Sequence, residues 1–131
     1  LAAHHNPGVT VTGANVGQWF LPAYGQLVKL AETIGFTPLT FTTSEVVSPH
    51  YKEGFPAGLP DKFTQIVKAA NPSMTQMDQH FFLSSTQIHG NLDYRPAYMF
   101  FQNNPPIGSK VYTGYCWNTM TNGCVLPFVE F

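Results

Sequence analysis

Apolar residues recur at helical spacing in two stretches of the chain. In Pro22–Ile34 they fall on one face, the first residue is a proline, and Gly35 stands where glycine commonly ends a helix. In the second stretch Asp61 suits an N-cap and Asn71 precedes a helix-stopping proline. The apolar stripe between them consists of Phe63, Ile66, Val67 and Ala70. The pattern predicts two amphipathic helices, Pro22–Ile34 and one that begins at Asp61.

A third, short helix is predicted from Ser73 through Leu83. Ser73 and Gln76 have the spacing of a capping box, in which each side chain accepts a hydrogen bond from a free backbone N–H of the first turn. Its core-facing residues would be Met74, Met77 and Phe81.

Segments of strand character alternate with these helices. Val9–Thr12 alternates apolar and polar residues, and Phe36–Val47 is rich in threonine and apolar residues. Ser48–Pro60, with its prolines and glycines, and the polar Ser84–Asp93 are expected to be loops. Three further strands are predicted at Ala97–Gln102, Ser109–Asn118 and Cys124–Phe131. The order of elements predicts a single α+β domain over residues 1–131, with an antiparallel sheet of four to five strands and two or three helices packed on one face.

The two cysteines, Cys116 and Cys124, flank a segment that ends in Asn122-Gly123. Asn-Gly is a strong hairpin signal, because both residues accept the backbone angles that a tight turn needs. A disulfide across this hairpin would fix the pairing of its two strands. We therefore predict a disulfide bond and an extracellular location, in a secreted, surface or virion protein.

The composition narrows the classes of partner. Charged residues make up 10% of the chain, against roughly 25% in typical soluble domains, and the net charge is −1. The six basic residues are scattered, which argues against nucleic-acid binding. No apolar run approaches the roughly 18 residues of a transmembrane segment. Since the chain begins at Leu1 rather than Met, we expect a mature or fragment sequence from which any signal peptide has been removed.

Aromatic and amide residues concentrate in the last third of the chain. Such residues stack on sugars or build protein interfaces, and a surface with little charge packs readily against copies of itself. The candidate binding residues are Tyr112, Tyr115, Trp117 and Asn118.

One segment carries groups suited to acid–base chemistry. His50 and Glu53 lie close together in sequence and could act with His89 in phosphodiester cleavage. The Pro-His and Glu-Gly-Phe sequences around them resemble a loop of small secreted fungal ribonucleases, which implies a hydrolytic site. The resemblance covers only these residues. The Glu and Arg that the family places on neighbouring strands are missing downstream, so no catalytic residue is carried over.

Met74, Met77 and His80 could share one flank of a helix and offer a copper(I)-type ligand set, although the same spacing serves core packing. We expect no metal and no cofactor.

Three functions remain open. The first is a non-enzymatic structural subunit of a filament, coat or capsid-like assembly, in which Val9–Val11 and Val125–Phe131 pair with the sheet edge of a neighbour. The alternatives are a small secreted carbohydrate-binding module and a small secreted hydrolase. The features together favour self-association and a protein that is not an enzyme.

Overall fold

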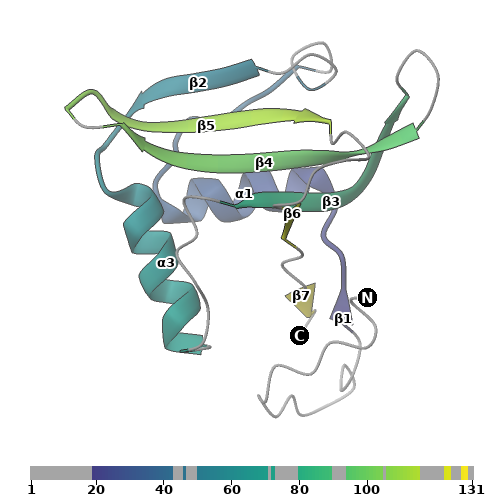
Figure 1. Ribbon diagram of the computed structural model, residues 1–131, viewed down its shortest axis with the longest axis horizontal. Coiled ribbons are helices and arrows are strands. Elements are labelled where there is room, and N and C mark those ends of the chain that lie inside the picture. The colour runs from purple at the N-terminus through teal and green to yellow at the C-terminus, as the bar shows by residue number, and fades with distance from the viewer. Residues whose placement is uncertain are drawn as a thin grey trace.

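A computed structural model describes residues 19–42, 46, 50–70, 72, 80–89, 94–104, 106–115, 123–124 and 128–129. Two helices and a five-stranded sheet dominate this part of the chain, and β1 and β7 form a separate pair (Figure 1). The elements are β1 (Trp19–Phe20), α1 (Tyr24–Ile34), β2 (His50–Phe55), α3 (Leu59–Ala70), β3 (Phe81–His89), β4 (Tyr94–Asn104), β5 (Gly108–Tyr115), β6 (Gly123–Cys124) and β7 (Phe128–Val129).

The sheet has the order β2-β5-β4-β3-β6. The first four strands are antiparallel, and the two-residue β6 adds to β3 in parallel. Helices alternate with the early strands and five consecutive strands follow, so the architecture is α+β as the sequence predicts.

Helix α1 agrees closely with the prediction. Its three fully buried residues recur at a spacing of four and three, which turns one stripe toward the sheet: Leu27, Ala31 and Ile34. Gly35 ends the helix with a φ of 128°, a conformation that favours glycine, and its N–H donates to the last carbonyls. At the other end, the backbone N–H of Tyr24 donates to the Thr86 hydroxyl of β3 at 2.9 Å, which fixes the start of the helix against the sheet.

Aromatic rings fill the core between the helices and the sheet. The ring of Phe101 on β4 has its centroid 5.1 Å from that of Phe36, 5.4 Å from Phe63 on α3 and 5.6 Å from Phe82 on β3. Phe101 therefore joins three separate segments. The buried cluster also contains Leu27, Ala31, Ile34, Leu39, Phe55, Leu59, Met99 and Val111.

The second predicted helix is confirmed as α3, which begins at Leu59 rather than at Asp61. Ile66 was assigned to its buried stripe, and this is wrong because the side chain is 51% exposed. Figure 1 shows that α3 runs away from one end of the sheet. Phe63 and, one turn later, Val67 still pack against the core, so Ile66 lies beside this stripe rather than on it.

The strand predicted over Phe36–Val47 is wrong in its described part, residues 36–42 and 46, which form no strand. Phe36 and Leu39 are nevertheless fully buried. The apolar residues of this segment fill the space beside α1 instead of pairing with a neighbour, and Pro38 has no N–H to offer a sheet.

The loop predicted over Ser48–Pro60 is also wrong, because His50–Phe55 forms the edge strand β2. The pairing of β2 with β5 contains a bulge between Lys52 and Phe55. Gly54 lies in the bulge with a φ of 89°. The extra residue breaks the alternation of side chains by which a strand is recognised in sequence.

The helix predicted through Leu83 and the loop over Ser84–Asp93 are replaced by strand β3, Phe81–His89. Residues 73–79 of that predicted helix and residues 90–93 of that predicted loop lie outside the described part. Pairing with β4 along most of its length, and with β6 at its start, overrides the local helix signal.

The strand predicted over Ala97–Gln102 is confirmed within β4, and the one over Ser109–Asn118 agrees with β5 as far as Tyr115. The single strand predicted over Cys124–Phe131 is wrong. Its described residues belong to β6 and β7, which lie in different sheets.

The predicted Cys116–Cys124 hairpin is not the pairing found in the structure. Strand β5 lies between β2 and β4, whereas Cys124 on β6 pairs with Phe82 of β3. Cys116 lies outside the described residues, so the disulfide remains a prediction.

Candidate functional site

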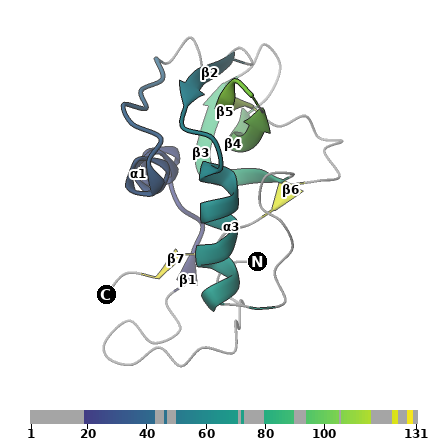
Figure 2. The ribbon, with the colours of Figure 1, turned by 90° about the vertical axis from the view of Figure 1, so that its left-hand side faces the viewer.

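The two faces of the sheet differ. Figure 2 places α1 on one side of the sheet, and the side chains of Phe82, Phe101 and Val111 point into the core that α1 and α3 share with it. Because successive side chains of a strand alternate, their neighbours in sequence belong to the opposite face. We call this opposite side the outer face.

An aromatic row crosses the outer face. Its members pair directly across four strands and consist of Tyr51 on β2, Tyr112 on β5, Phe100 on β4 and Phe81 on β3. Successive ring centroids are 5.4, 5.7 and 4.9 Å apart. At the β2 end, Tyr51 is 48% exposed. A four-ring apolar strip that ends at the protein surface is a candidate for contact with a partner.

Charged groups lie beside the exposed end of this row. The Lys110 ammonium is 2.9 Å from the Glu53 carboxylate and 4.8 Å from the centroid of the Tyr51 ring. The hydrogen bond to Glu53 raises the pKa of Lys110, so the ammonium stays charged throughout the neutral range. We call Tyr51, Glu53 and Lys110 the charged corner. The exposed Gln102 faces Lys110 across β4 and β5 and extends this polar border.

The structure separates the candidate acid–base residues. His50 pairs with Thr113, which accepts a hydrogen bond from the Tyr24 hydroxyl of α1 at 2.6 Å and so belongs to the helix side of the sheet. Glu53 lies on the outer face, where it contacts Lys110. His89 ends β3, and β4 and β5 lie between it and β2, a separation of about 14 Å across three strand spacings. These three residues do not converge on one cleft.

The candidate binding residues are divided as well. Tyr112 is part of the aromatic row, whereas Tyr115, three residues further on, belongs to the opposite face by strand alternation. There the Arg95 guanidinium lies 5.4 Å from the centroid of its ring. Trp117 and Asn118 lie outside the described residues.

The metal candidates Met74 and Met77 also lie outside the described residues, and His80 directly precedes β3. In the part of the chain that the structure describes, no group of three or more His, Cys, Asp or Glu residues could hold a metal ion. None of the described helices is long and apolar enough to cross a membrane.

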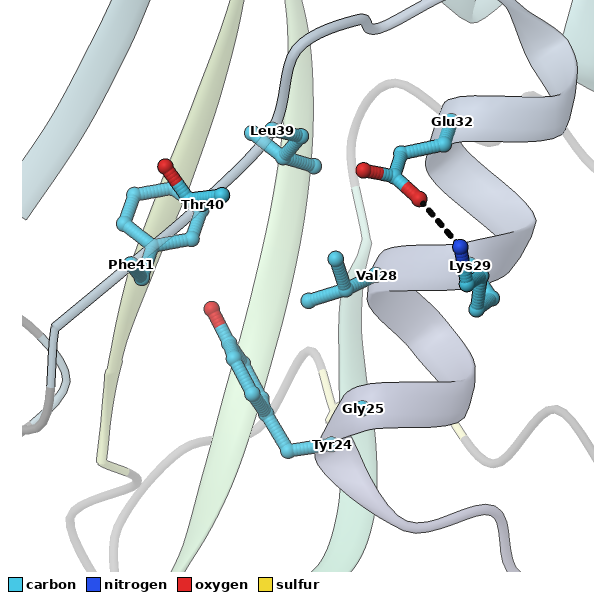
Figure 3. A pocket seen from close by; sticks show the side chains of 8 residues that line it. All are labelled: Tyr24, Gly25, Val28, Lys29, Glu32, Leu39, Thr40 and Phe41. Atoms are coloured by element: carbon cyan, nitrogen blue, oxygen red, sulfur yellow. Dashed lines mark hydrogen bonds and ion pairs between the residues drawn. The ribbon is translucent and has the colours of Figure 1, made fainter.

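A separate groove of about 360 Å³ lies between α1 and the segment 39–41 (Figure 3). The side chains of Tyr24 and Val28 point toward Leu39 and Phe41, and the Lys29–Glu32 ion pair lies at its rim. The Tyr24 hydroxyl is used within the protein, in its bond to Thr113. The groove is mainly apolar and brings no set of polar groups together, so we assign it no activity.

Three members of the aromatic row, and Lys110 of the charged corner, were not identified from sequence. Tyr51 was placed in a loop, Phe81 in a helix, and Lys110 carried no motif. The available signal was the Tyr51-Lys52-Glu53 alternation, in which Tyr51 and Glu53 share one face of a strand.

Comparisons of the chain with models of known protein families, with curated proteins and with solved structures found no match. The functional argument therefore depends on the geometry of the outer face.

Proposed function

We propose that this protein is a non-enzymatic, extracellular structural subunit that associates with copies of itself through the outer face of its sheet. The observation that carries the proposal is the aromatic row, which crosses four strands and ends at the half-exposed Tyr51. The low content of charge supports it, because a net charge of −1 gives little repulsion between copies.

The location of the contact differs from the one expected from sequence. Val9–Val11 lies outside the described residues, and Phe128–Val129 pairs with β1 of the same chain. The edge strand β2 carries a bulge and Lys52, features by which proteins discourage pairing of sheet edges. These observations favour contact through the face of the sheet over contact through its edge.

The size of the face sets the expected strength of each contact. Four strands about 4.8 Å apart, with the aromatic row and one side-chain row about 7 Å to either side of it, span at most roughly 400 Å². This is about half of the roughly 800 Å² that each partner buries in a standard stable interface. Each contact is therefore weak, with a dissociation constant in the micromolar range or above, and repetition of the contact strengthens an assembly.

Replacement of Tyr51 by aspartate tests the proposal. Tyr51→Asp puts a second carboxylate beside Glu53 at the exposed end of the row, and we expect at least a tenfold rise in the dissociation constant for self-association. Sedimentation velocity over a range of protein concentrations measures it.

Ile66→Asp is the matched control, because Ile66 is 51% exposed on α3 and Tyr51 is 48% exposed on β2. A native chain that stays monomeric up to millimolar concentration would refute the proposal, and so would equal weakening by both substitutions.

A carbohydrate-binding module is the second candidate, favoured by an exposed tyrosine beside a carboxylate and an amide. The Tyr112 ring lies between Tyr51 and Phe100, with centroid distances of 5.4 and 5.7 Å, whereas Tyr51 ends the row and is 48% exposed, so Tyr51 is the ring best placed to stack on a sugar. A glycan array on which the native chain binds nothing, or binds as well after Tyr51→Ala, would remove this candidate.

A further inference from the structure

The charged corner has a property beyond its exposure: it carries both signs of charge side by side. The Glu53 side chain is 48% exposed and that of Lys110 is 18% exposed. They project from adjacent strands on the same face, with the Tyr51 ring in contact with the ammonium. Such a pair is complementary to the same pair on a second copy. When a twofold axis between the two groups relates the copies, the carboxylate of each chain faces the ammonium of the other.

We infer that the partner of the charged corner is the same corner of a second copy, with Glu53 of each chain against Lys110 of the other. This inference depends on the proposed self-association and specifies its contact. The two carboxylates and two ammonium groups would then form one network around the paired Tyr51 rings. The Glu53 side chain is about half exposed, so water screens part of its attraction to Lys110, and exchange of partners between two chains costs little.

The physical role of this network is to set which surfaces meet. The aromatic row supplies apolar contact, which has little directionality. Charges at its border penalise arrangements that bring like charges together and thereby fix the relative orientation of the copies. The rest of the chain favours a copy over a strongly charged partner, since only 13 residues are formally charged, 6 Lys+Arg and 7 Asp+Glu.

Complementary charge reversal tests the inference. In Glu53→Lys both groups of the corner are positive, and in Lys110→Glu both are negative. We expect each variant alone to show about a tenfold or greater rise in its self-dissociation constant, because the same twofold arrangement now opposes like charges. An equimolar mixture of the two variants restores opposite charges across the contact. We expect its dissociation constant to return to within about threefold of the native value.

Sedimentation velocity with one variant fluorescently labelled measures the mixed species, and far-ultraviolet circular dichroism verifies that both variants fold. Sodium chloride at 1 M should remove most of the difference between each variant and the native chain, because it shortens the screening length to about 3 Å.

The outcomes separate the two proposals. A native chain that does not associate refutes both. Association that is unaffected by either reversal, or that the mixture fails to restore, overturns the pairing of the corners and leaves self-association through the outer face standing. A folded variant that associates only with its complementary variant supports the inference.

Discussion

Phe101→Ala is expected to lower the free energy of unfolding by about 3–5 kcal/mol, the range typical of emptying a buried phenylalanine site. Phe101 is 2% exposed, and its ring contacts one ring from the segment after α1, one from α3 and one from β3. Since a domain of this size has roughly 5–15 kcal/mol of stability in total, the loss is a large part of it. Urea denaturation followed by circular dichroism measures the effect.

Phe100→Ala is the control, because the two residues are adjacent in β4 and of the same type. The Phe100 side chain lies on the outer face and is partly exposed, so less apolar area is lost and a cost of about 1–2 kcal/mol is expected. Equal costs for the two substitutions would show that the outer face is packed as tightly as the core, and would contradict its assignment as a contact surface.

The helices could be predicted because their signals are local. Apolar residues at a spacing of three and four, followed by a glycine, predict the extent and the buried face of α1 almost completely. The same reasoning found α3 but misjudged Ile66. The adjacent Val67 packs against the core whereas Ile66 is exposed, so the burial of Ile66 depends on how the helix is rotated against the core, which the sequence of the helix alone does not determine.

The errors among the strands have two physical causes. In β2 the bulge at Gly54 disrupts the alternation by which a strand is recognised. In β3 a capping-box pattern upstream suggested a helix, and the cross-strand pairing of Phe81–His89 with β4 decided otherwise. Pairing with a neighbouring strand depends on residues outside the segment, so no pattern within Phe81–His89 alone encodes it.

The candidate site illustrates the same limit. Tyr112 could be singled out by residue type, but the row exists only because Tyr51, Phe100 and Phe81 come into register with it from three other strands. The separation of His50 from Glu53 likewise follows from strand alternation once β2 is known to be a strand.

Gly108→Ala is the second substitution expected to have a large effect, a loss of about 2–4 kcal/mol in the free energy of unfolding. Gly108 has a φ of 112°, where an alanine is strained by roughly 1–2 kcal/mol. An added methyl group would also overlap the carbonyl oxygen of Phe55, a backbone atom that moves only if β2 moves. Thermal and urea denaturation of the variant measure the combined cost.

Gly54→Ala separates strain from overlap. Gly54 has a φ of 89° and an added Cβ would meet nothing within 4 Å, so the cost should be the strain alone, about 1–2 kcal/mol. The larger loss of stability expected for Gly108→Ala has a functional consequence. To make room for the added methyl group, β2 must shift relative to β5 close to the contact between Glu53 and Lys110. We therefore expect Gly108→Ala to weaken self-association more than Gly54→Ala does in the folded state, as measured by sedimentation. Equal stability and equal association of the two variants would show that β2 can move away from an added methyl group at Gly108 without cost. Its pairing with β5 would then not hold the charged corner in place.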